Sequence, residues 1–122
     1  MTKLVEMDEK VKFSTQMEEK VGPVVFIKLM KVKPEDVDQF LKAWAEDAAY
    51  FKSQPGHISA QLHRGIGGSN TFINYAIWES TEHVKKAADN ANLQGHTSNY
   101  PANTVISTHL FKKIAIPGIC VE

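Results

Sequence analysis

Cysteine and long apolar runs are scarce in this sequence of 122 residues, and both absences narrow what the protein can be. The single cysteine, Cys120, cannot form a disulfide within the chain or contribute to a cluster of thiolate metal ligands, so a reducing compartment is expected. No apolar run approaches the roughly 20 residues of a membrane-spanning helix. Residues 1–20 mix charges where a secretory signal would be apolar. We therefore expect a soluble, cytoplasmic protein that does not act in a membrane.

An excess of one charge is also lacking. The 14 basic and 14 acidic residues cancel, and without a basic stripe the sequence gives no support for binding nucleic acid or an anionic membrane surface. The five histidines, at positions 57, 63, 83, 96 and 109, show neither HxH nor HExxH spacing and have no acidic cluster beside them, so we expect no bound metal. Hydrophobic residues at 43% and charged residues at 23% are typical of one globular domain.

The apolar patterns predict six elements between a charge-rich N-terminal arm, residues 1–21, and a C-terminal tail, residues 117–122. The arm contains an alternation at Val11, Phe13 and Thr15 that indicates a short strand. Beyond the arm, the patterns predict strands at 24–31, 57–63, 72–78 and 105–116, and helices from Pro34 to Gln54 and at 81–92. The glycine-rich segment 65–70 joins two strands, which is typical of a hairpin loop and not of a phosphate-binding loop.

This β-α-β-β-α-β order predicts an α+β, ferredoxin-like fold over residues 22–116, with an antiparallel sheet and both helices on one face. Strands 24–31 and 72–78 are apolar on both sides, yet the helices can cover only one face of the sheet. An uncovered apolar face needs a partner, and a second copy of the chain is the simplest one. We therefore expect a homodimer.

The strand Phe72-Ile73-Asn74-Tyr75-Ala76-Ile77-Trp78 carries an amide among apolar neighbours. Because side chains alternate along a strand, Phe72, Asn74, Ala76 and Trp78 share one face. A buried amide without a partner costs about 1–3 kcal/mol, so Asn74 should bond either to the protein or to a ligand. Both alternatives stay open at this point.

The sequence resembles the antibiotic biosynthesis monooxygenase family of dimeric α+β barrels over about residues 22–116. The resemblance is carried by the strand that opens onto Lys33-Pro34-Glu35, the turn Gln54-Pro55-Gly56-His57-Ile58, the segment FINYAIWES, and His96 after the second helix. It implies a cofactor-independent monooxygenase that oxidises a small aromatic phenol, quinol or anthrone with O2 as co-substrate. It also implies that Asn74 holds a phenolate or peroxide oxygen, and that Trp78 forms an aromatic wall.

Further candidates complete the expected pocket. Phe72 and Ala76 share the strand face of Asn74, and Trp44 and Phe51 lie on the apolar stripe of the first long helix, so we expect these four to contact substrate. His96 and His63 are the candidate bases for removing a substrate proton. The small apolar face of the second helix, Val84, Ala87, Ala88 and Ala91, either packs closely on the sheet or leaves room for a ligand.

Two other functions remain open. In the first, the protein is a non-catalytic, dimeric binding or stress-related barrel, and Asn74 satisfies a group within the fold. In the second, it binds or degrades haem through His96. The haem-degrading branch resembles this chain less, because the positions of its first-strand Asn and second-helix Trp fall near Ile27 and Ala87.

Overall fold

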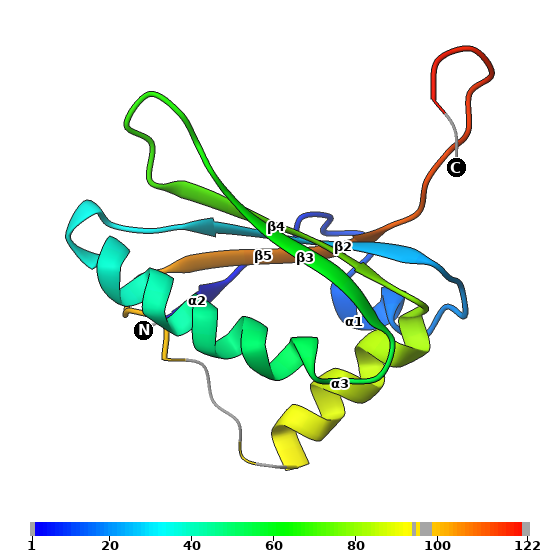
Figure 1. Cartoon of the computed structure of the whole chain (residues 1–122), viewed down its shortest axis with the longest axis horizontal. Coiled ribbons are helices and arrows are strands. Elements are labelled where there is room, and N and C mark those ends of the chain that lie inside the picture. Colours follow the sequence, from blue (N-terminus) through cyan, green and yellow to red (C-terminus); the bar gives the residue numbers. More distant parts are fainter. Residues whose placement is uncertain (1, 94, 96–98, 121–122) are drawn as a thin grey trace.

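The computed structural model describes residues 2–93, 95 and 99–120 (Figure 1). Its main strands are β2 (Val24–Lys31), β3 (His57–Arg64), β4 (Thr71–Trp78) and β5 (Val105–Phe111), with a short β1 (Lys3–Leu4). Its helices are α1 (Phe13–Gln16), α2 (Val37–Lys52) and α3 (Thr81–Leu93), and a 3-10 turn, η1 (Pro34–Asp36), leads into α2. The four main strands and two long helices confirm the predicted ferredoxin-like α+β fold.

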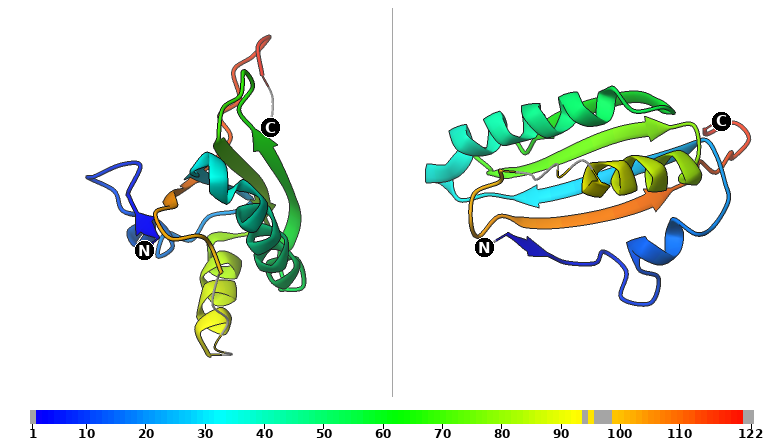
Figure 2. Two further views of the ribbon diagram at one scale, coloured as in Figure 1. Left: turned by 90° about the vertical axis from the view of Figure 1, so that its left-hand side faces the viewer. Right: turned by 90° about the horizontal axis from the view of Figure 1, so that it is seen from below.

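The strands form one sheet in the order β1-β5-β2-β4-β3. The four main strands pair antiparallel, and β1 adds to the edge of β5 in parallel. Figures 1 and 2 show α2 and α3 on the same face of this sheet, with the N-terminal arm beside β5. Within the described residues no helix is long and apolar enough to cross a membrane.

Two strand predictions were wrong, the first in the type of element and the second in its length. Phe13–Gln16 forms a helical turn, because the carbonyl of Lys12 accepts the backbone N–H groups of Thr15 and Gln16. The last strand ends at Phe111 and not at Ile116. Phe111 pairs with Val25, the second residue of β2, so β2 is nearly used up as a pairing partner at this point. Beyond this point Ile116 pairs instead with Cys120 in a small turn of the tail.

The core beneath the helices consists of two hydrophobic clusters. The first gathers Val24, Ala76, Trp78, Val84, Ala87 and Leu110; the second gathers Met30, Val32, Val37, Phe40, Phe72 and Ile106. Between them, the strand register aligns Lys28 of β2 with Asn74 of β4 and Thr108 of β5. We call these three residues the polar row; it divides the helix-covered face of the sheet.

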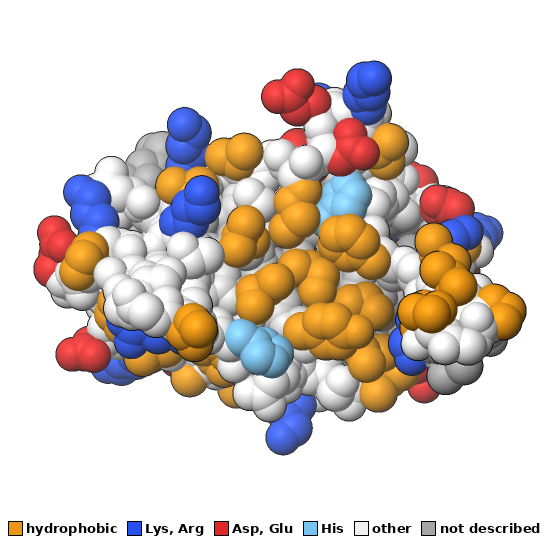
Figure 3. Space-filling view, turned by 90° about the horizontal axis from the view of Figure 1, so that it is seen from above, with side chains coloured by type: hydrophobic (Ala, Val, Ile, Leu, Met, Phe, Trp, Pro, Cys, Tyr) orange, Lys and Arg blue, Asp and Glu red, His pale blue; other side chains and the backbone are white. Residues whose placement is uncertain are grey.

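The opposite side of the sheet, here called the open face, is apolar and partly exposed. It carries Ile27, Leu29, Ile73, Tyr75, Ile77 and Phe111, which alternate with the helix-facing residues. Figure 3 shows hydrophobic side chains gathered at the centre of this face. Tyr75 is 41% exposed in the single chain, so a large apolar surface there is not covered by the chain itself.

Candidate functional site

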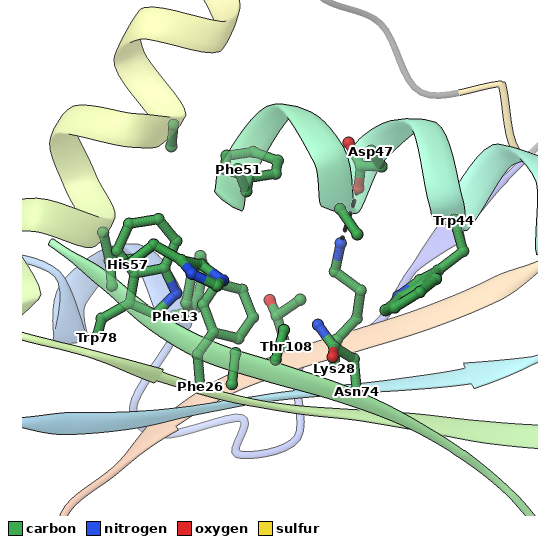
Figure 4. Close-up of a pocket in the computed structure, with 15 residues that line it drawn as sticks. Phe13, Phe26, Lys28, Trp44, Asp47, Phe51, His57, Asn74, Trp78 and Thr108 are labelled. Atoms are coloured by element: carbon green, nitrogen blue, oxygen red, sulfur yellow. Dashed lines mark hydrogen bonds and ion pairs between the residues drawn. The ribbon is translucent and has the colours of Figure 1, made fainter. Parts of the chain in front are cut away.

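A cavity of about 230 Å³ lies between the sheet and the helices α2 and α3 (Figure 4). Aromatic side chains form much of its wall: Phe13, Phe26, Trp44, Phe51 and Trp78. The polar side chains that reach it are Lys28, Asp47, His57, Asn74 and Thr108. A mostly aromatic cavity with a few polar groups is typical of a site for a small, flat organic molecule.

The polar row supplies the floor of this cavity. Lys28, Asn74 and Thr108 come from the three central strands at one level of the sheet, so the backbone ladder fixes their spacing. The side-chain oxygen Oδ1 of Asn74 is buried and has no hydrogen-bond partner among the described residues. An unpartnered buried amide is costly, and a hydrogen bond from a bound molecule would remove that cost.

A buried charge pair spans the cavity from the sheet to α2. The Lys28 Nζ lies 3.4 Å from Asp47 Oδ2, and the two side chains are 17% and 6% exposed. The Tyr100 hydroxyl donates to the same Oδ2 at 3.2 Å, and Lys28 Nζ lies 5.8 Å from the centre of the Tyr100 ring. Burial, followed by the charge and hydrogen bond of Asp47, raises the pKa of Tyr100. The phenol therefore stays neutral and keeps the proton that it donates.

His57 stands at the aromatic end of the cavity. Its ring meets Trp78 edge to face, with centroids 5.0 Å apart and planes at 82°. Burial and then the positive charge of Lys52 lower the pKa of His57. At neutral pH its imidazole is therefore mainly uncharged and able to accept a proton.

The structure brings together most of the residues that the sequence indicated for a site. Asn74, Ala76, Trp78, Trp44 and Phe51 all line the cavity. The alanine face of α3 also contributes, because Ala88 lines the cavity while Ala87 is buried in the core.

Two other candidates, Phe72 and His63, lie away from the cavity. Phe72 belongs to the second hydrophobic cluster, where its ring lies 4.7 Å from that of Phe40. His63 is exposed and pairs with Ile73, which places it on the open face. His96 lies outside the described residues.

Several residues of the cavity escaped the sequence analysis. Asp47 lies three residues after Trp44 and four before Phe51, so helical spacing alone puts it on the same stripe. Lys28 interrupts the alternation of Phe26 and Met30 in the same way. In each case a charge at an apolar position was the available signal.

His57 was missed for another reason. A register shift between His57 and Ser59 places His57 opposite Trp78, whereas Ser59 pairs with Ile77 on the open face. The irregularity puts His57 and His63 on opposite sides of β3, although simple alternation would place them together.

The fold and cavity define a small α+β domain with an internal cavity lined mainly by aromatic side chains. The profile of the antibiotic biosynthesis monooxygenase family matches residues 23–96, so the chain belongs to this family. A search of curated proteins finds no match.

Solved structures of similar fold include oxygenases and a haem-degrading protein. A proposed monooxygenase from Shewanella loihica is 26% identical with a TM-score of 0.67, covering 78% of this chain and 97% of that one. SnoaB, a cofactor-independent oxygenase from Streptomyces nogalater, is 22% identical with a TM-score of 0.69, covering 80% and 99%. MhuD, a haem degrader from Mycobacterium tuberculosis with two haems bound, is 26% identical with a TM-score of 0.59, covering 79% and 100%.

Proposed function

We propose that this protein is a cofactor-independent monooxygenase that oxidises a small aromatic phenol, quinol or anthrone with O2. The observation that carries the proposal is the buried, unpartnered Oδ1 of Asn74 on the floor of a cavity walled by aromatic rings. Membership of the monooxygenase family supports the reaction class. The cavity volume of about 230 Å³ supports a compact substrate, because it lies below the range of about 300–1,000 Å³ usual for drug-sized ligands.

In the proposed reaction the substrate supplies the electrons. It loses a proton and becomes an anion, one electron passes to O2, and the resulting radical and superoxide combine to a peroxide. Loss of water from the peroxide leaves a quinone, so that one oxygen atom enters the product and the other leaves as water. The Nδ2–H of Asn74 donates to the oxygen that carries the negative charge, and its Oδ1 accepts a hydrogen bond from a substrate hydroxyl. Trp78 forms the wall against which the ring system lies.

His57 is the base in this proposal. Figure 4 shows His57 beside Trp78 on one side of the cavity, and Asn74 with Lys28 on the other. In an anthrone the acidic C–H and the oxygen that receives the charge lie across the ring from each other. A substrate that spans the cavity would therefore place its acidic hydrogen near His57 and its oxygen near Asn74. The lowered pKa of His57 keeps the imidazole free to take the proton.

The proposal includes a homodimer formed through the open face. Ile27, Ile73 and Tyr75 provide the apolar centre of that face, and a second copy would remove them from water. The cavity lies on the other side of the sheet, so dimerisation leaves the lining described above intact.

Haem binding is the alternative that the comparison with MhuD raises. The described residues do not fit a haem, because the cavity of about 230 Å³ is narrowed by aromatic rings and crossed by the Lys28–Asp47 pair. We therefore assign haem no step in the reaction. A haemin titration that produced a Soret shift would favour this alternative.

The central test is Asn74→Ala with 1,8-dihydroxyanthrone as substrate, followed by O2 uptake and quinone absorbance. Loss of one group that binds the developing oxyanion predicts a fall in kcat of roughly 100-fold. Asn70→Ala is the matched control, because Asn70 lies just before β4 and its Oδ1 accepts a hydrogen bond from Arg64 away from the cavity. Unchanged turnover in Asn74→Ala would refute the role of Asn74. Binding of the anthrone without any turnover by the native protein would favour a binding module.

The pH dependence of kcat/KM tests His57. The neutral imidazole is the active form, so activity should fall only as the pH drops below about 6.5, through the lowered pKa of His57. His57→Gln should remove this acid limb and lower the rate. Lys52→Gln should move the limb to higher pH, since the Lys52 charge contributes to the lowered pKa. An acid limb that does not respond to Lys52→Gln would contradict the assignment.

A further inference from the structure

Lys28 occupies an unusual position for a lysine. It lies in the middle of the central strand β2 and faces the helices, between the two hydrophobic clusters. Its side chain is only 17% exposed, although an ammonium group is costly to remove from water. Its partner, Asp47, is buried and belongs to α2. Placing a pair of charges here serves stability poorly, because apolar side chains in the same space are often at least as stabilising.

The surroundings of Lys28 turn the ammonium toward the cavity. Asp47 lies at 3.4 Å and takes one of its N–H donors, while the Tyr100 hydroxyl bonds to the same carboxylate oxygen. Figure 4 shows Lys28 rising beside Asn74 and Thr108 toward Asp47. A lysine has three N–H donors in all, so it can donate to a ligand while it stays paired. Lys28 is also the single Lys or Arg among the described residues of the cavity wall.

We propose that Lys28 is a catalytic residue that stabilises the negative charge on the substrate oxygen, beside the amide of Asn74. Asp47 and Tyr100 are positioning residues, because they hold the ammonium from the helix side. A fixed cation in a cavity walled mainly by aromatic rings stabilises a developing oxyanion with little reorganisation of solvent. The inference rests on the proposed function, since it takes an aromatic compound that ionises at oxygen as the substrate.

The proposal predicts a shifted ionisation of a bound phenol. The probe is 4-nitrophenol, whose ionised form absorbs at longer wavelength than the neutral form. When it ionises, the O–H bond breaks, the electron pair stays on oxygen, and the proton passes to water. Bound to the native protein, the probe should titrate at lower pH than free in solution. In Lys28→Met the bound probe should titrate about 1 unit higher than in the native protein, because an opposite charge within 4–6 Å lowers the pKa of an acid by about 1–3 units.

Asp47→Asn separates this role from that of a structural ion pair. The asparagine keeps a hydrogen-bond acceptor for Lys28 but removes the negative charge, so the bound probe should titrate at still lower pH. The two variants thus shift the ionisation in opposite directions. If the pair were only structural, both variants would bind the probe more weakly, and the pH at which the bound probe titrates would not shift in opposite directions.

Controls and refuting outcomes complete the experiment. Lys31→Met, on the same strand but exposed and opposite Thr71, should leave the ionisation unchanged, and Lys28→Arg should preserve it. The neutral probe 4-nitrotoluene should bind native protein and Lys28→Met alike, which reports an intact cavity. The inference fails if the nitrophenol does not bind the native protein, if Lys28→Met titrates as the native protein does, or if both variants shift together. Because the assay needs no O2 and no turnover, its result is independent of the Asn74→Ala rate.

Discussion

Gln16 ties the N-terminal arm to the edge of the sheet, and its removal should loosen the arm. The side-chain amide bonds to both backbone groups of Leu110: Nε2 donates to the carbonyl at 2.9 Å, and Oε1 accepts the N–H at 2.9 Å. It therefore takes the place of a neighbouring strand. Phe13, one helical turn earlier, lines the cavity and lies 5.2 Å from Phe26. The same short helix thus holds both the edge contact and part of the cavity wall.

The loss of stability expected for Gln16→Ala follows mainly from these two hydrogen bonds; Nε2 also lies 3.0 Å from His109 Nε2. Each hydrogen bond contributes about 0.5–1.5 kcal/mol net to stability. In the variant, water can reach the half-buried edge and replace part of the lost hydrogen bonding. Gln16→Ala should therefore lower the free energy of unfolding by about 1–2 kcal/mol in urea denaturation. Trypsin should also cleave the arm faster at Lys10, Lys12 or Lys20, because local opening becomes easier.

Gln39→Ala is the matched control, since Gln39 is an exposed residue of α2. This variant should change the free energy of unfolding by less than about 0.5 kcal/mol. If Gln16→Ala matched the control in both urea denaturation and trypsin cleavage, the arm would not be held by Leu110 and the reasoning would be refuted.

Two further predictions concern a turn and the open face. Gly56→Ala should strongly lower the free energy of unfolding in urea denaturation, because φ is +87° and a Cβ would come within 2.2 Å of the His83 ring. Gly67→Ala is the matched control: φ is +72° but nothing lies within 4 Å, so the free energy of unfolding should fall by only about 1–2 kcal/mol. Equal losses would contradict the steric argument. Tyr75→Glu should convert the proposed dimer to monomer in sedimentation equilibrium, while Ile66→Glu in the exposed hairpin loop should not. A native protein that sediments as a monomer would disprove the dimer.

The sequence was sufficient for the main elements because their patterns are local. The apolar, β-branched runs of β2 and β4 and the 3.6-residue stripe of α2 can each be recognised within a few neighbouring residues. The observed strand Val24–Lys31 has the predicted bounds. The structure of the arm was harder to predict from the sequence. Its contacts join Gln16 to Leu110, far along the chain, and no local pattern indicates such a bond.

The candidate site was only partly predictable for the same reason. Asn74 and Trp78 stood out as a polar and an aromatic residue on one strand face. The pairing of Lys28 with Asp47 and Tyr100 joins three segments, and it requires the packed structure. The histidine facing the cavity depended on a bulge at Ile58, which shifts the register by one residue and leaves no clear trace in composition.

The polar row has a consequence for how this protein could change its substrate. Because Lys28, Asn74 and Thr108 separate two hydrophobic clusters, neither cluster relies on them for its own apolar contacts. Substitutions in the row can therefore alter the chemistry of the cavity floor while each half of the core keeps its packing. A molecule bound across the row would touch both halves at once, so ligand binding should raise the melting temperature.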